Sequence, residues 1–332
     1  MGSDKLAILL LNMGGPDSLE AVRPFLKNLF SDPAIINLPG FLRLPLASVL
    51  STRRARKVIP RYRLIGGKSP ISQITRDQAT ALGSTLAGAG QQTTCVLPAF
   101  SYWHPFISES VLRSVKEGAQ NLLVLSLYPQ YCRATTGTCL TDLARALKST
   151  PLASDVTIID RWSDHPGYLD ALAGTVTEAL NEIPSTERDD TVILFSAHGV
   201  PESLVKSGDP YYEETLLTVN GIMERLGSRK HRLAFQSRLG PVKWLEPSLP
   251  DALRELSRGG APPVVVVPVS FVSDHIETLY ELDIQHREIA QELGFRTFVR
   301  SPALNTRPDF IQALADLALE AIKDKQRLGI KG

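Results

Sequence analysis

The segment FVSDHIETLYELD, residues 271–283, places several proton- or metal-binding side chains directly after the apolar run PPVVVVPVS. These side chains are Asp274, His275, Glu277, Glu281 and Asp283. At about 100° per residue, Asp274, Glu277 and Glu281 fall on one stripe of an α-helix. A carboxylate stripe after a buried strand is typical of a cation site, but Asp274 at the N-cap with Glu277 at N3 is equally typical of a capping box. The segment alone leaves both interpretations open.

A second candidate for this chemistry is His198, which ends the apolar run TVILFSAH and precedes Gly199. A lone histidine is more often structural than functional. However, ligands of open α/β sheets bind beyond the carboxyl ends of the strands, which is where His198 falls. One imidazole with carboxylates suits a borderline divalent cation such as Fe²⁺. We expect His198 and Glu277 to converge only if the strands preceding them are neighbours.

Eight short apolar runs, separated by helical stretches, are available to position these residues. They begin near residues 5, 93, 121, 155, 191, 231, 263 and 295. Near-continuous apolar strands alternating with helices indicate parallel sheets covered on both faces. A long helical stretch at 165–183 separates the first four from the last four. We therefore predict an α/β fold of two doubly wound halves, each with a parallel four-stranded sheet, rather than one barrel.

The segment at about 35–65 interrupts this alternation. It carries Phe41 and several leucines within residues 38–50, then six basic residues between 53 and 63. One interpretation is a helical insertion with a solvated basic face. The other is an apolar lip with an arginine collar, which would suit a flat apolar ligand bearing carboxylates, or a membrane surface.

Composition excludes several classes of function. The 332 residues include 36 basic and 35 acidic side chains, so no nucleic-acid partner is expected. Three cysteines without metal-type spacing favour a reducing, cytosolic compartment.

Apolar runs fall short of the roughly 18 to 20 residues of a membrane span, and the N-terminal stretch is typical of a first strand rather than a signal peptide. The turn NMGGPDS is not G-x-G-x-x-G, so a nucleotide-binding oxidoreductase has little support.

Six stretches, in order along the whole chain, resemble the ferrochelatase family, whose members insert ferrous iron into a porphyrin. They are LLLNMGGPDSLEAVRPFLKNLF, YRLIGGKSPISQIT, LYPQYCRATTGT, LFSAHGVPESLVKSGDPYYEE, AFQSRLGPVKWLEP and FVSDHIETLYELDI. The resemblance implies two Rossmann-like, chelatase-type domains with a porphyrin cleft between them. We expect the first domain at 1–166 plus 305–332, with the insertion at about 35–65, and the second at 167–304.

The resemblance also implies roles for individual residues. The family's active-site histidine and glutamate fall on His198 and Glu277, which are expected to contact the metal. Asp274 and His275 lie alongside, and the acidic row continues to Glu281. The next position of that row is usually acidic but is Gln285 here. This departure implies a shorter proton relay.

Further positions are implied for porphyrin binding. The arginine and serine that hold a propionate fall on Arg54 and Ser69. Cleft-wall positions fall on Met13, Tyr62, Tyr102 and Trp244. Some relatives have an arginine before that tyrosine, where this chain has Ser101, so one anionic contact is expected to be missing.

The implied function is insertion of Fe²⁺ into protoporphyrin IX with release of two protons, the terminal step of haem biosynthesis. Alternatives are a coproporphyrin ferrochelatase, another tetrapyrrole metal chelatase, and a non-catalytic tetrapyrrole carrier. The leucine-rich lip favours protoporphyrin. No tightly bound cofactor is expected, and no [2Fe–2S] cluster, because no cysteine follows Cys139. We expect a cytoplasmic protein with peripheral contact to the inner membrane face through residues 38–50, and leave its oligomeric state open.

Overall fold

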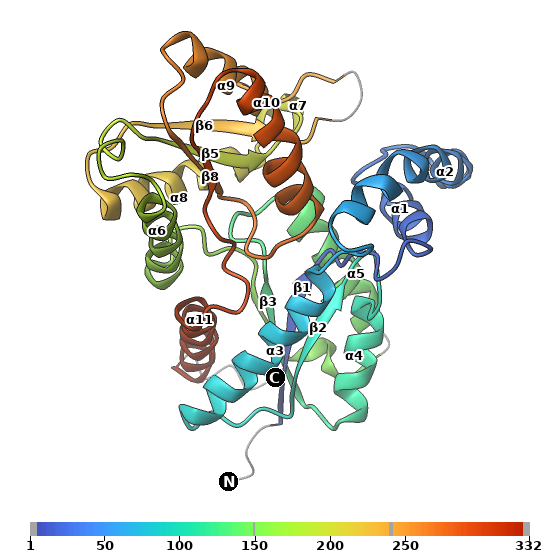
Figure 1. Ribbon diagram of the computed structural model, residues 1–332. Coiled ribbons are helices and arrows are strands. Elements are labelled where there is room, and N and C mark those ends of the chain that lie inside the picture. Colours follow the sequence, from blue (N-terminus) through green and yellow to red (C-terminus); the bar gives the residue numbers. More distant parts are fainter. Residues whose placement is uncertain (1–4, 149, 239–241, 328–332) are drawn as a thin grey trace. The chain divides into compact units, whose positions relative to one another are not determined.

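A computed structural model describes residues 5–148, 150–238 and 242–327 (Figure 1). Residues 239–241 of the motif AFQSRLGPVKWLEP lie outside this description, as do both ends of the expected first domain. The chain divides into two compact units. The first runs to Trp162 and resumes at Phe310, and the second is Ser163–Asp309.

These boundaries differ by a few residues from the expected 166/167 and 304/305. The Thr218 hydroxyl donates to the carbonyl of Ser163 at 2.7 Å, which ties residue 163 to the second unit. Asn305 forms a hydrogen bond with Asp274, and Arg307 forms an ion pair with Glu178, so residues 305–309 also belong to the second unit.

The first unit contains a parallel four-stranded sheet in the order β2-β1-β3-β4. Its strands are β1 (Leu6–Asn12), β2 (Cys95–Phe100), β3 (Asn121–Ser126) and β4 (Val156–Ile159). Residues 7–12 of β1 are buried on both faces, as expected of a central strand in a sheet covered by helices on both sides. Ile107 and Val111 of α4 and Leu143 of α5 pack on one face, and α3 contacts β1 and β2.

The helical segments of the first unit follow the strands as predicted. They are α1 (Val22–Phe30), α2 (Gly40–Leu64), α3 (Ile71–Gly88), α4 (Ile107–Lys116), the π-helical turn η1 (Arg133–Gly137), α5 (Thr138–Leu147), the 3₁₀ turn η2 (Pro151–Ser154) and most of α11 (Pro308–Arg327). The helices α1 and α2 pack against each other (Figure 1). α2 occupies most of the predicted insertion, and its first half exposes apolar side chains: Phe41 is 76% exposed, Leu42 50% and Leu44 53%.

The second unit repeats the arrangement with the order β6-β5-β7-β8, again all parallel. Its strands are β5 (Val192–His198), β6 (His231–Gln236), β7 (Val264–Pro268) and β8 (Phe298–Arg300). Its helices are α6 (Pro166–Asn181), α7 (Glu202–Lys206), α8 (Tyr211–Leu226), α9 (Leu249–Arg258), η3 (Glu277–His286) and α10 (Arg287–Glu292). The prediction of two parallel four-stranded sheets is confirmed. β5 and β7 are neighbours, so the condition for His198 and Glu277 to converge is met.

The segment after β7 differs from the expected α-helix. η3 is a ten-residue π-helix, the form whose characteristic bond runs from an N–H to the fifth carbonyl before it rather than the fourth. Thr278, Leu282 and His286, four residues apart, are its buried side chains. The interpretation of Asp274 and Glu277 as a capping box is wrong: the N-cap is Ile276, with no side-chain capping bond. The N-cap falls two residues after Asp274, which turns its carboxylate to Thr278 and Asn305 instead.

None of the helices in the described ranges is both long and apolar enough to cross a membrane.

Candidate functional site

His198 and Glu277 meet at the carboxyl end of the second sheet. His198 is the last residue of β5, and Glu277 opens the π-helix after β7. The chain leaves β5 for β6 on one side and returns past β5 to β7 on the other, so the β5–β7 edge is a topological switch point, where open α/β sheets bind ligands. Nδ1 of His198 lies 2.7 Å from Oε2 of Glu277. The two strands therefore deliver a hydrogen-bonded imidazole–carboxylate pair to this crevice.

The charge of each member of the pair favours the ionised form of the other. Burial by itself lowers the pKa of His198, but the carboxylates of Glu277 and Glu281 outweigh it and raise the pKa above the ordinary value. Burial likewise opposes the charged form of Glu277, yet His198, His275 and the Ser237 hydroxyl hold the pKa of Glu277 well below its usual range. The His198 side chain is still 38% exposed, against 17% for Glu277. The imidazole is thus charged readily and remains open to a substrate.

Ser237, which sequence reasoning missed, connects the two glutamates of the π-helix. It follows β6 with a φ of 63°, in the left-handed region that non-glycine residues rarely adopt. Its hydroxyl can donate to Oε2 of Glu277 at 3.2 Å and also makes a short contact with the carboxylate of Glu281. Gln236 adds donations from its amide to the Glu277 carbonyl at 3.1 Å and to Glu281 at 3.4 Å. The end of β6 therefore gathers both acids beside His198.

Gly199 is required next to the histidine because the backbones come very close there. Its N–H donates to the carbonyl of Gln236 at 2.7 Å. A Cβ at this position would lie only 2.7 Å from that oxygen and 3.4 Å from Cε3 of Trp244. The pairing of β5 with β6 and the placement of Trp244 near His198 both depend on this missing side chain.

Asp274 does not join Glu277 and Glu281, so the predicted stripe of three carboxylates is wrong. Oδ1 of Asp274 lies 3.3 Å from Nη1 of Arg300, and Oδ2 accepts from the Asn305 amide at 2.9 Å. The reason is the same as for the capping box. Asp274 precedes the π-helix, so its side chain does not follow the helical spacing of Glu277 and Glu281.

His275 is a buried neighbour of the pair. It is 5% exposed, and its Nδ1 donates to the carbonyl of Ser273 at 3.0 Å. Burial lowers its pKa. Its ring packs against Phe271 with centroids 4.5 Å apart, and the His198 ring approaches the same Phe271. His275 thus lies behind the His198–Glu277 pair.

The described part of the chain holds no group of three or more His, Cys, Asp or Glu side chains placed to bind a metal ion. Structural metal sites close around the ion with four ligands. His198 and Glu277 together offer one imidazole and one carboxylate.

Comparison with known proteins decides the family. The family model described as ferrochelatase matches residues 5–322. A ferrochelatase of Geotalea uraniireducens is 47% identical over 323 residues, covering 97% of this chain and 99% of the relative. Ferrochelatases of Geobacter metallireducens and Trichodesmium erythraeum are 48% and 47% identical, covering 96% and 97% of this chain and 99% and 84% of those relatives.

The chain belongs to the ferrochelatase family. This confirms the resemblance drawn from the six sequence stretches.

Solved chelatase structures share the fold. SirB from Bacillus subtilis with Fe³⁺ aligns with a TM-score of 0.60 at 12% identity, covering 96% of this chain and 95% of that one. CbiX, described as the terminal enzyme of sirohaem biosynthesis in denitrifying bacteria, aligns with a TM-score of 0.52 at 15% identity, covering 96% and 98%. At these identities the likeness establishes the chelatase-type fold alone.

The ferrochelatase positions expected to bind porphyrin in the first unit follow its strands or lie on its insertion. Met13 follows β1 and Tyr102 follows β2. Arg54 and Tyr62 lie on α2, and Ser69 precedes α3. Met13 and Arg54 are half-buried, whereas Tyr62, Ser69 and Tyr102 are buried. Their contact with a porphyrin stays a prediction.

Asp32, a second residue that sequence reasoning missed, fixes Tyr102. The Tyr102 hydroxyl donates to Oδ2 of Asp32 at 2.6 Å, and the Thr138 hydroxyl donates to the same oxygen at 2.9 Å. Burial and the nearby Asp32 charge raise the pKa of Tyr102, so its hydroxyl stays protonated. Asp32 thereby ties the segment between α1 and α2 to the loop after β2 and to the start of α5.

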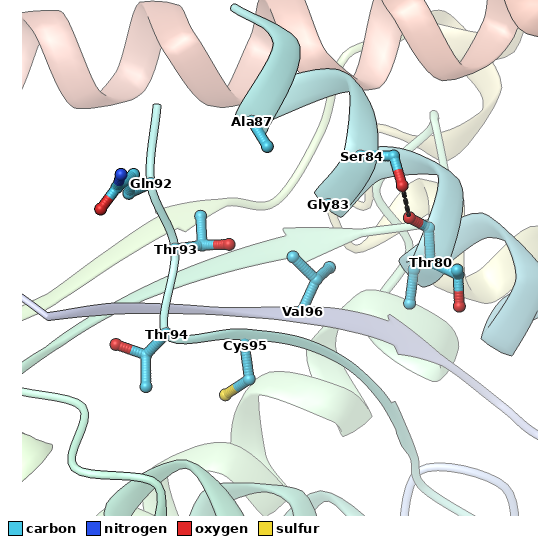
Figure 2. A pocket seen from close by; sticks show the side chains of 10 residues that line it. Thr80, Gly83, Ser84, Ala87, Gln92, Thr93, Thr94, Cys95 and Val96 are labelled. Carbon is cyan, nitrogen blue, oxygen red and sulfur yellow. Dashed lines mark hydrogen bonds between the residues drawn. The ribbon is translucent and has the colours of Figure 1, made fainter. Parts of the chain in front are cut away.

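A hollow in the first unit lies away from these positions. Figure 2 shows that it is lined by α3 and by residues 92–96, including Thr80, Ser84 and Thr93. Residues 92–96 precede and begin β2, so the hollow lies at the amino end of the strands. Met13 and Tyr102 lie at the opposite, carboxyl edge.

Proposed function

We propose that this chain inserts Fe²⁺ into protoporphyrin IX, forming protohaem and releasing two protons, with His198 and Glu277 as the residues that contact the metal and take the pyrrole protons. The observation that carries the assignment is the 2.7 Å contact between the imidazole and the carboxylate at the β5–β7 switch point. Membership of the ferrochelatase family supports the reaction class.

The chemistry needs a base that also tolerates a cation. Two pyrrole N–H bonds break, four Fe–N bonds form, and the iron remains Fe²⁺ throughout. Imidazole titrates near neutral pH, so neutral His198 can accept a proton from a pyrrole, and the carboxylate of Glu277 stabilises the imidazolium that forms. Because the pair is hydrogen-bonded in advance, little reorganisation accompanies the transfer.

Glu281 extends the path for protons. The Ser237 hydroxyl lies between the carboxylates of Glu277 and Glu281 and carries one proton, so it can donate to one while it accepts from the other if that one is protonated. We assign the path of protons away from His198 to the carboxylates of Glu277 and Glu281 and the Ser237 hydroxyl between them. Gln285 cannot continue the relay because an amide does not titrate. Asp274 is bound to Arg300 and Asn305 instead, and we assign it and His275 to support of the pair.

Porphyrin binding is assigned to Met13, Arg54, Tyr62, Ser69, Tyr102 and Trp244. Arg54 is a half-buried guanidinium on α2, a group well suited to a propionate carboxylate. Trp244 packs beside Gly199, next to the reactive histidine. The fixed Tyr102 and the buried Tyr62 would support the face that meets the macrocycle.

The exposed apolar side chains of α2 favour protoporphyrin over coproporphyrin. Phe41, Leu42 and Leu44 are each at least half exposed. Protoporphyrin carries two carboxylates and coproporphyrin four, so an apolar surface suits the former. The same surface, residues 38–50, supports peripheral contact of a cytoplasmic protein with the inner membrane face.

Anaerobic metallation assays test the substrate assignment. Fe²⁺ is added to the enzyme with protoporphyrin or with coproporphyrin, and the loss of free-base fluorescence is followed. We expect faster turnover of protoporphyrin. A preference for coproporphyrin would assign the chain to the alternative substrate. Binding of both without metallation would identify a carrier and overturn the enzymatic proposal.

A further inference from the structure

Arg300 is a charged residue that contacts the segment carrying Glu277 and that the chemistry above does not use. It ends β8, at the edge of the second sheet. Its Nε lies 2.8 Å from Oδ1 of Asp283, and its Nη1 lies 3.3 Å from Oδ1 of Asp274. The Arg300 side chain is only 11% exposed, so these are shielded ion pairs.

We propose that Arg300 is a positioning residue that holds the π-helix so that Glu277 faces His198. The inference rests on the proposed function, because it concerns the placement of Glu277. Asp274 lies three residues before Glu277 and Asp283 six residues after it. One guanidinium therefore fixes the chain on both sides of the catalytic carboxylate.

We call Arg300 together with Asp274 and Asp283 the clamp. Neighbouring contacts reinforce it. Asp274 also accepts from Thr278 at 2.9 Å, within the first turn of the π-helix. Arg287 donates from Nε to the carbonyl of Asp283 at 3.0 Å and from Nη1 to the carbonyl of Phe298 at 2.6 Å. The π-helix is thus tied to β8 by two arginines.

A π-helix needs such ties because its geometry is rare and is found chiefly as short insertions at functional sites. Leu282, fully buried in the core, anchors one side of the π-helix. Without Arg300, Asp274 and Asp283 would be partly buried carboxylates lacking this cation, a costly arrangement. The segment would then be free to rewind with a different pitch, which would turn Glu277 away from His198.

The test compares Arg300→Met and Arg300→Lys with a matched control, Arg307→Met. Arg307 forms ion pairs with Glu178 at 2.8 Å and Asp309 at 3.0 Å in the same unit, without contacting the π-helix. We expect Arg300→Met to lower kcat for metallation by about 10- to 100-fold, as for a misplaced catalytic group, with porphyrin affinity changed by less than about twofold. Arg300→Lys should recover part of kcat, because lysine restores the charge without the planar fork. Arg307→Met should retain the wild-type kcat.

Hydrogen–deuterium exchange of peptides covering 273–288 measures the clamp independently of activity. Exchange there should accelerate in Arg300→Met and remain at the wild-type rate in Arg307→Met. Unchanged exchange in both Arg300 variants would overturn the proposal, whatever happens to kcat. Equal acceleration throughout the second unit would also overturn it, because Arg300 would then merely stabilise the fold. If exchange changes as expected but the wild-type chain metallates no porphyrin, the clamp stands and the proposed function fails.

Discussion

The hydrogen bond between His198 and Glu277 links the protonation of the two side chains. The raised pKa of His198 stabilises the fold below the ordinary value of 6.5, and this contribution is lost as pH rises through the raised value. The lowered pKa of Glu277 contributes stability above 4.5 that is lost as pH falls toward about 2. The ion pair is therefore strongest between 4.5 and 6.5. Proton acceptance by His198 needs its neutral form, so metallation should increase with pH above this window.

A titration of His198 by NMR tests this directly. In the wild-type protein the imidazole should titrate above 6.5. In Glu277→Gln its pKa should fall, because burial is then opposed only by the more distant Glu281. Glu255→Gln, which changes an exposed glutamate on α9, serves as the control and should leave the titration unchanged. An unaltered His198 pKa in Glu277→Gln would show that the pair is not coupled as the structure indicates.

Individual residues differ in how far the sequence could predict them. His198 and Glu277 were predictable because one ends an apolar strand and the other lies in the segment after a second apolar strand, and parallel strands bring such positions to one edge. Ser237 was not, because its role depends on a left-handed φ imposed by the surrounding structure. Asp32 and Arg300 act through contacts with residues far along the chain, and no local pattern marks either one.

The helix after β7 is a π-helix, and its sequence does not distinguish it from an α-helix. Buried residues at 278, 282 and 286 are four apart, a spacing that an α-helix also allows. Periodicity therefore predicts a helix but cannot distinguish i→i+4 from i→i+5 bonding. The error in the position of Asp274 has a separate cause, which is that the helix begins after it.

At the scale of the elements, α2 is predicted to bind the porphyrin through Arg54. Arg54→Ala should weaken protoporphyrin affinity by about tenfold, the low end for a hydrogen bond to a charged group, and leave kcat nearly unchanged. Quenching of protein fluorescence by the porphyrin measures the affinity. Arg56→Ala is the matched control, since it removes the same charge from an exposed position two residues along the helix. Equal losses in both variants would indicate a general charge effect rather than a propionate contact.

The molecule as a whole follows the pattern of its apolar runs. All eight strands begin within three residues of the predicted starts, the largest difference being β8, which begins at Phe298 rather than near 295. The strand order did not follow from the runs themselves. It is the order β6-β5-β7-β8 that brings His198 and Glu277 together. The sequence predicts that the two residues converge if β5 and β7 are neighbours, and the structure shows that these strands are neighbours.

The two-donor pair also fits the treatment of iron as a substrate. A closed set of ligands would retain the ion, whereas insertion requires its release to the porphyrin nitrogens. The central claim of the proposal is that His198, beside Glu277, performs the metallation step.

Single-turnover metallation by His198→Ala tests that claim most directly. Enzyme loaded with protoporphyrin is mixed anaerobically with Fe²⁺, and the loss of free-base fluorescence is timed, with His231→Ala, an exposed histidine on β6, as the control. We predict a rate lower by about 10²- to 10⁴-fold in His198→Ala, typical for removal of a general base, with porphyrin affinity within about twofold of wild type. A His198→Ala enzyme that metallates protoporphyrin at the rate of the control would contradict the account.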